Sequence, residues 1–108
     1  MFLDEYQKQA VATAVYPISH LVIYPALGLA GEAGEIANKV KKVLRDDNGV
    51  VSEERRQSLK GEIGDALWYS AALARDLGFT LGEIAEENIA KLKSRQVRGV
   101  IQGEGDNR

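Results

Sequence analysis

Four acidic residues form two pairs whose spacing suits metal binding. Glu32 and Glu35 belong to the pentapeptide GEAGE, and Glu62 and Asp65 belong to the similar pentapeptide GEIGD. The two acids of each pair are three residues apart, so they project from the same face of a helix. Carboxylate oxygens are hard ligands that favour Mg²⁺, Mn²⁺ or Ca²⁺ over zinc. The pentapeptides therefore predict a site for divalent cations, provided that they lie side by side.

The segment between the two pentapeptides predicts this arrangement. Their central residues, Ala33 and Ile63, have residue 48 as their midpoint, and Asn48-Gly49 is a strong turn signal. A chain that reverses there gives two antiparallel helices, with arms of roughly 18 and 15 Å between motif and turn. We therefore expect the acids of the two motifs to face one another.

Asp65 gives a separate reason to expect a bound cation. It opens the segment DALWYSAALA, which is apolar nearly all round and therefore predicts burial. No Lys or Arg lies one turn away from Asp65. A buried carboxylate without a partner is costly, so it must be protonated, pair with a distant cation or bind a metal.

The first acidic pair has an alternative interpretation as part of a solvated face. On a helical wheel, Glu32 and Glu35 lie away from the apolar face that contains Ile36 and Val40. In that case Glu35 and Lys39 would form an ordinary ion pair between positions i and i+4.

Glycines interrupt the helix that carries the first pair. Gly28, Gly31 and Gly34 each cost about 1 kcal/mol relative to alanine inside a helix. Small residues allow a helix to approach its neighbour closely or leave space for a bulky ligand. Tight packing alone would also explain them.

The remaining signals predict an all-α fold with about four helices. Ser52 is a suitable N-cap, Gly78 is a suitable helix end, and Thr80 and Glu83 form a capping box. No segment is typical of a paired strand, although LVIY is ambiguous. We expect one domain over residues 1–95 and an irregular tail over 96–108. The helices are expected near residues 4–16, 26–45, 53–77 and 81–95.

Composition excludes several classes of protein. The chain has 108 residues, a net charge of −2 with scattered Lys and Arg, and no cysteine. These features argue against binding of a nucleic-acid polymer and exclude disulfides, zinc-thiolate sites and thiol nucleophiles. No apolar run approaches the ~20 residues of a membrane span, and the N-terminus does not look like a signal peptide. We expect a cytoplasmic protein with no membrane partner, and so short a chain favours oligomerisation.

The last helix offers polar residues beside an apolar stripe. Asn88 falls within the stripe, while Lys91 and Arg95 flank it, where they could reach a phosphate. The alternative is that these cations only complement the helix dipole. Trp68 could stack on a base or pack in the core. His20, the only histidine, lacks a Glu-x-x-His partner, which disfavours a di-iron site.

The segments GLAGEAGEIANKVKK, GEIGDALWYSAALA and NIAKLKSR, taken in this order, resemble the MazG-like nucleoside triphosphate pyrophosphohydrolases. The resemblance covers most of residues 26–95 and implies an all-α bundle of four to five helices whose core is completed in a homodimer or homotetramer. It implies Mg²⁺-dependent cleavage, with Mn²⁺ as a substitute, of an NTP or dNTP between the α and β phosphates. The implied metal and catalytic residues are Glu32, Glu35, Glu62 and Asp65. The candidates for substrate contacts are Lys39, Lys42, Trp68, Asn88, Lys91 and Arg95.

The resemblance fits the chemistry of these residues. Metal ions would neutralise phosphate oxygens, a free carboxylate would accept a proton from water, and cations would stabilise the pyrophosphate leaving group. Some relatives carry an acid where this chain has Gly31, so the identity of the general base stays open. The main hypothesis is a house-cleaning pyrophosphohydrolase. A regulatory oligomer that binds metal or nucleotide, a purely structural bundle and an enzyme acting on another phosphorylated nucleotide are the alternatives.

Overall fold

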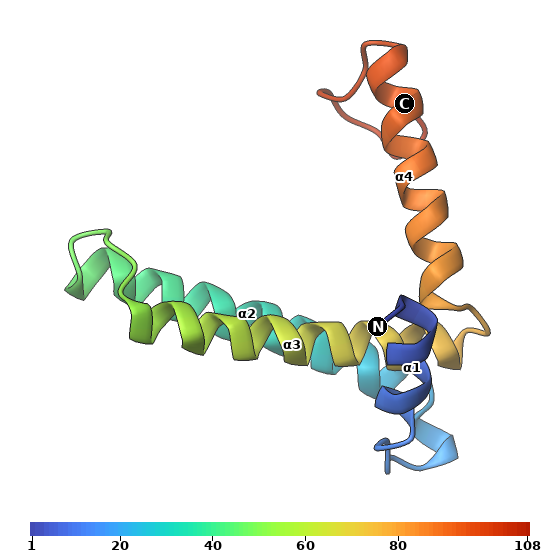
Figure 1. The fold of residues 1–108 in the computed structure, drawn as a ribbon, viewed down its shortest axis with the longest axis horizontal. Helices are drawn as coiled ribbons and strands as arrows, with labels where there is room; N and C mark the ends of the chain where they lie inside the picture. The colour runs from blue at the N-terminus through green and yellow to red at the C-terminus, as the bar shows by residue number, and fades with distance from the viewer.

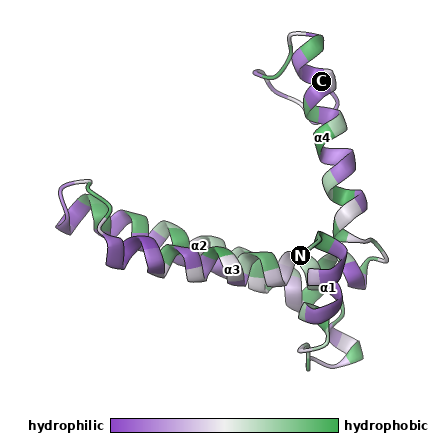
Figure 2. Ribbon diagram, viewed as in Figure 1, coloured by the Kyte–Doolittle hydropathy of each residue, from purple (hydrophilic) through white to green (hydrophobic).

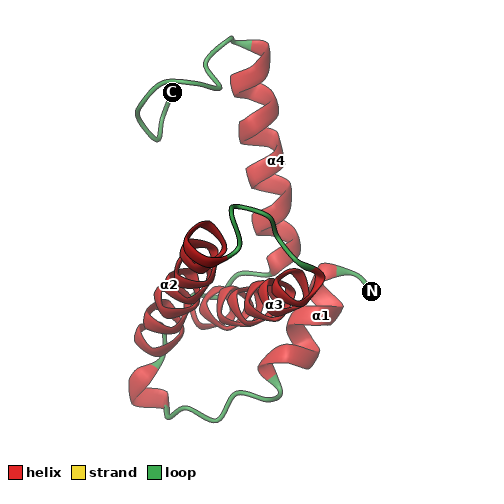
Figure 3. Cartoon of the chain, turned by 90° about the vertical axis from the view of Figure 1, so that its left-hand side faces the viewer, coloured by secondary structure: helices red, strands yellow, loops and turns green.

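The computed structural model describes all 108 residues and contains helices but no strands (Figure 3). The all-α class is therefore confirmed, with four α-helices as expected. The helices are α1 (Leu3–Val11), the 3₁₀ turn η1 (Ile18–His20), α2 (Ile23–Asp46), α3 (Glu53–Asp76) and α4 (Leu81–Val97).

Most predicted helix ends are confirmed because they depend on local hydrogen bonds, but the first helix ends at Val11 and not near residue 16. The Ser52 hydroxyl accepts the Arg55 N–H at 3.1 Å at the start of α3. Thr80 and Glu83 form the capping box at the start of α4. Gly78 follows the end of α3 with φ of +85°, a conformation that glycine adopts without steric cost.

The start of α2 differs from the expectation that the helix follows Pro25. The helix begins at Ile23, so Pro25 lies in its first turn. A proline is tolerated there because the first N–H groups of a helix have no intrahelical acceptor.

Helices α2 and α3 form a long antiparallel hairpin (Figure 1). Each has 24 residues, which corresponds to roughly 36 Å of helix. The chain reverses at Asn48 and Gly49, whose φ angles are +54° and +77°. The prediction that the two acidic motifs lie side by side is therefore confirmed.

The face that α2 packs against α3 coincides only in part with the apolar face expected from the helical wheel, of which Leu29 and Ile36 are partly buried. Val43 is 3 % exposed, but Val40 and Leu44 are 42 % and 70 % exposed. Glu32 and Lys39 are instead partly buried. With one neighbouring helix, α2 buries only a narrow stripe, which combines the apolar Ile36 and Val43 with these two charged residues. Hydrophobic residues consequently remain on the outer surface of the hairpin (Figure 2).

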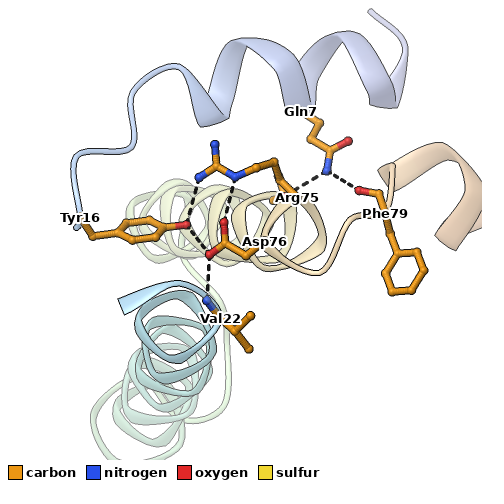
Figure 4. Close-up of polar contacts among 7 residues, drawn as sticks. Gln7, Tyr16, Val22, Arg75, Asp76 and Phe79 are labelled. Atoms are coloured by element: carbon orange, nitrogen blue, oxygen red, sulfur yellow. Dashed lines mark hydrogen bonds and ion pairs between the residues drawn. The ribbon is translucent and has the colours of Figure 1, made fainter. Parts of the chain in front are cut away.

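The compact core lies where α1, α3 and the start of α4 meet. Its buried side chains are small, and Tyr6 and Trp68 pack against them. Gln7 is buried beside this cluster and links the three helices (Figure 4). Its amide donates to the carbonyl oxygens of Ala71 and Phe79 at 3.1 Å each, and its oxygen accepts the Leu81 N–H at 3.1 Å. A buried polar group is thereby fully satisfied.

A carboxylate at the end of α3 caps the start of α2. The Asp76 side chain is 0 % exposed and pairs with Arg75 at 2.8 Å. It accepts hydrogen bonds from the Tyr16 hydroxyl at 2.8 Å and the Val22 N–H at 2.9 Å (Figure 4). Val22 has a φ of +68°, which is unfavourable for a β-branched residue. The Asp76 bond helps to hold this conformation at a helix start that has no side-chain cap of its own.

These donors also set the protonation of Asp76. Burial by itself would raise the pKa of the carboxyl, but the bonds from Val22, Tyr16 and Arg75 outweigh burial and hold the pKa below its ordinary value. Because the folded-state pKa is lowered, the associated stability is present above the ordinary Asp pKa and is lost as the pH falls below it.

Helix α4 contacts α1 and projects away from the hairpin (Figure 1). The radius of gyration is 16.7 Å, whereas a compact domain of this length has a value of about 13 Å. Only nine of the 108 residues are buried, so the single chain is open in shape. No helix combines the length and the apolar character needed to cross a membrane.

The Asp76 contacts generate the first prediction. Asp76→Ala should lower the free energy of unfolding by roughly 1–3 kcal/mol, because the Val22 N–H and the Tyr16 hydroxyl lose a buried acceptor. Urea denaturation monitored by circular dichroism measures the change. Asp46→Ala is the matched control, because Asp46 also pairs with the preceding arginine but is exposed. Equal stability of the two variants would contradict the capping role.

Candidate metal centre

Three carboxylates converge between the helices of the hairpin. Glu32 of α2 and Glu62 and Asp65 of α3 each place one oxygen within 4.8 Å of the other two. The fourth predicted ligand, Glu35, is exposed on α2 and is not part of this triad. The antiparallel pairing of the two motifs therefore brings three of the four acids together.

The buried carboxylate oxygen belongs to Glu32 and not to Asp65. Asp65 was expected to be buried, but it is exposed. Within the single chain, packing at this level of α3 covers the side that carries Glu62 and leaves Asp65 outside. Oε2 of Glu32 is instead buried without any hydrogen-bond partner. An orphaned anionic acceptor of this kind is costly unless it gains a proton or a cation.

Lys39 neutralises part of the negative charge of the triad. Its ammonium lies 2.9 Å from Oε1 of Glu62 and donates to the Ser58 hydroxyl at 2.6 Å. The alternative ion pair between Glu35 and Lys39 is not formed, so that expectation is wrong. Ser58 was not recognised from the sequence, although its position four residues before Glu62 places both on one face of α3.

The crowding of charge shifts two pKa values in opposite directions. The pKa of Glu32 rises from about 4.5 to about 7, because a proton on Glu32 can be donated to Glu62 and because burial and the neighbouring carboxylates disfavour its ionised form. The pKa of Glu62 is lowered, first by the Lys39 ammonium and then by the hydrogen bond with Glu32. The Lys39 ammonium thus favours the ionised form of Glu62, while the crowding favours the protonated form of Glu32.

A cavity of about 400 Å³ adjoins the triad. It is lined by Glu32, Asp65, Trp68 and Tyr69, so it combines two acids with two aromatic rings. The Trp68 indole N–H donates to the Ala10 carbonyl at 3.0 Å and to the Thr13 hydroxyl at 2.8 Å. Trp68 is therefore anchored in the core while part of its surface faces the cavity.

One glycine on α2 is explained by the aromatic wall of this cavity. A Cβ atom at Gly28 would lie 2.1 Å from the Tyr69 ring, so only glycine permits this contact. The glycines next to the acids differ, because a Cβ atom at Gly31, Gly34, Gly61 or Gly64 would meet nothing within 4 Å. Among these five glycines, packing inside one chain accounts for Gly28 alone.

The predicted substrate contacts on α4 lie apart from the triad in a single chain. Asn88 and Lys91 line a shallow cavity on α4 itself. Arg95 is buried and donates to the Asp106 carbonyl at 2.6 Å, because the C-terminal tail folds back on the helix. Lys42 is partly buried on α2, and no ion pair holds it. His20 is exposed in η1.

The ligand atoms of the triad are of the kind that a hard divalent cation prefers. All donors are oxygens, and the orphaned Oε2 of Glu32 is available as a ligand. Opposite ligands of an octahedral Mg²⁺ lie about 4.2 Å apart. Neighbouring ligands lie only about 3.0 Å apart, and among three ligands at least two pairs are neighbours. The donor atoms, which lie within 4.8 Å of one another, would therefore draw together when they bind the ion.

Comparison of the sequence with known protein families identifies the family of this chain. Residues 24–99 match the MazG nucleotide pyrophosphohydrolase domain. The chain belongs to this family. The match includes both acidic motifs and α4. The chain is also similar to the Gene 37 protein of Mycobacterium phage L5. The two sequences are 50 % identical over 114 aligned positions, and the alignment covers both chains in full. No solved structure matches the chain.

The raised pKa of Glu32 generates the second prediction. Between pH 4.5 and about 7 the folded protein keeps a proton that the unfolded chain releases, so the stability of the metal-free protein falls as the pH rises. Glu32→Gln should remove this loss, since the amide carries no charge. The variant should therefore melt at a higher temperature than the unsubstituted protein at pH 8 in EDTA and at a similar temperature at pH 5.

Glu35→Gln is the control for this experiment. Glu35 lies on the same helix but outside the triad. Its substitution should leave the pH dependence of the melting temperature largely unchanged. The same gain in stability at pH 8 for both variants would show that general charge reduction, rather than the triad, is responsible.

Proposed function

We propose that this protein hydrolyses nucleoside triphosphates or their deoxy forms between the α and β phosphates, giving the monophosphate and pyrophosphate. The observation that carries the proposal is the convergence of Glu32, Glu62 and Asp65 across the hairpin, in a chain that belongs to the MazG nucleotide pyrophosphohydrolase domain family. Removal of unwanted nucleotides is the proposed biological role.

The triad would hold Mg²⁺, with Mn²⁺ as a substitute. When bound, the cation supplies positive charge for the phosphate oxygens and acidifies water. Glu32 and Glu62 hold their carboxylates at the helix interface, while Asp65 reaches the site from its exposed edge. Glu35 lies one turn from Glu32 and is available as a fourth ligand or as the group that accepts a proton from water.

The neighbouring cavity is the proposed place for the nucleoside. Its volume of about 400 Å³ accommodates a base or a sugar, and it opens next to the acids that would face the phosphates. Trp68 and Tyr69 supply aromatic surface there. Aromatic faces stack on bases with little dependence on sequence, which suits a site that accepts several nucleotides.

We further propose that the protein functions as a homodimer or homotetramer. The exposed hydrophobic side chains on the hairpin and on α4 would be covered by a second copy of the chain. A chain with so few buried residues is marginally stable alone, and association would bury more apolar surface. In such an assembly, α4 of one chain could bring Asn88 and Lys91 near the acids of another. The exposed hydrophobic residues concerned are Val40, Leu44, Ile63, Leu67, Ile84, Ile89 and Leu92.

The third prediction tests the reaction. The purified protein with Mg²⁺ should convert NTPs or dNTPs into monophosphate and pyrophosphate, separated and identified by ion-exchange chromatography. Asp65→Asn should reduce turnover on the order of 100-fold or more while the fold is retained, because a ligand of the cation loses its charge.

Glu54→Gln is the control for Asp65→Asn, because it removes an exposed acid from the same helix outside the triad. Its turnover should match that of the unsubstituted protein. Diphosphate and orthophosphate as products would contradict the assigned bond. Stabilisation by metal and nucleotide without any turnover would instead support the regulatory alternative.

The fourth prediction tests the assembly. Light scattering coupled to size-exclusion chromatography should give a mass of at least two chains. Leu44→Asp should reduce that mass, because a charge would replace an apolar side chain that is 70 % exposed in the single chain. Val15→Asp is the control, since Val15 is 95 % exposed in a loop outside the hairpin. A monomeric unsubstituted protein would overturn the proposed assembly.

A further inference from the structure

We propose that Lys39 is a positioning residue that limits Glu62 to one ligating oxygen and thereby makes the site prefer Mg²⁺ over Ca²⁺. This inference rests on the proposed function, because it assumes that the triad binds a divalent cation. It concerns a different property, which is how the chain selects among cations of equal charge.

The argument begins with the two oxygens of Glu62. Oε1 lies 2.9 Å from the Lys39 ammonium, which is a direct charge-assisted contact. An ammonium on one carboxylate oxygen occupies one of its lone pairs and repels a cation bound to that oxygen. While the ion pair persists, binding of a cation through both oxygens of Glu62 is therefore disfavoured relative to binding through one.

The ion pair is held more firmly than an ordinary surface pair. Lys39 also donates to the Ser58 hydroxyl at 2.6 Å, so two groups of α3 fix the position of its ammonium. The side chains of Lys39 and Glu62 are only 27 % and 18 % exposed. An exposed ion pair of lysine contributes little to stability because both side chains are mobile. Here the helix interface and Ser58 restrict that motion.

The number of ligating oxygens distinguishes the two cations. Ca²⁺ takes six to eight oxygens at 2.3–2.6 Å and often binds a carboxylate through both of its oxygens. Mg²⁺ requires a near-octahedral arrangement at 2.0–2.1 Å, in which one oxygen from each carboxylate would supply three ligands and water or phosphate oxygens the rest. A Glu62 restricted to one oxygen denies Ca²⁺ a ligand that Mg²⁺ does not need.

The positive charge of Lys39 also affects the affinity for both cations, and the experiment must separate this effect from the geometry at Glu62. It repels any divalent cation, so its loss should strengthen binding of Mg²⁺ and Ca²⁺ alike. The ratio of the two dissociation constants cancels this common effect. A change in the ratio therefore reports the geometry at Glu62 rather than the charge of the site.

The fifth prediction uses isothermal titration calorimetry with MgCl₂ or CaCl₂ alone on the full chain. In Lys39→Met, Ca²⁺ affinity should rise relative to Mg²⁺ affinity by about tenfold, which corresponds to about 1.4 kcal/mol. Ser58→Ala should shift the ratio in the same direction but less, because the ammonium loses one anchor. Lys41→Met is the matched control, since it removes an exposed lysine from the same helix that pairs with no acid of the triad, and its ratio should equal that of the unsubstituted protein.

The outcomes separate this inference from the proposed function. If the unsubstituted protein binds neither cation, both proposals fail. If it binds Mg²⁺ but Lys39→Met and Lys41→Met give the same ratio, the role of Lys39 is wrong while the metal centre stands. If Lys39→Met does not fold, an unchanged ratio in Ser58→Ala overturns the inference. A structure of the Mg²⁺-loaded protein in which Lys39 has left Glu62 would also overturn it.

Discussion

The concentration of negative charge between α2 and α3 is the constraint on which the site depends. Three carboxylates share a region in which their oxygens lie within 4.8 Å, partly shielded from water by the helix interface. Like charges so close together cannot all remain ionised without a counter-charge. The chain supplies one ammonium from Lys39 and raises the pKa of Glu32, yet Oε2 of Glu32 still lacks a partner. The site is thus preorganised to gain from a cation.

The hairpin that creates this crowding is fixed at its open end by polar contacts rather than by a large core. Asp76 joins the end of α3 to the start of α2, and Gln7 joins α1 to α3 and to the start of α4. Each is buried and satisfied, so each specifies one arrangement of the helices. Trp68 connects this region to the site, because its indole N–H is anchored on α1 while its ring borders the cavity.

The open shape of the chain and the chemistry of the site are related. Helix α4 carries Asn88 and Lys91 away from the acids, and the hairpin leaves Leu44 and Ile63 exposed. The four glycines of the two acidic motifs likewise face open space. A second copy of the chain would account for the apolar residues, for these glycines and for the distance between cations and acids.

Local sequence determined the helices, their caps and the reversal at Asn48-Gly49, because each depends on neighbouring residues. The pairing of the two acidic motifs followed from their symmetry about that turn, and the motifs themselves indicated the family. The sequence alone did not predict that Glu32 would be partly buried or that Lys39 would pair with Glu62. Those features depend on which side of α2 meets α3. A helix with one neighbour buries only the stripe that the packing angle and the turn select. Hydrophobic periodicity alone cannot locate that stripe when the helix also carries exposed apolar residues on another side.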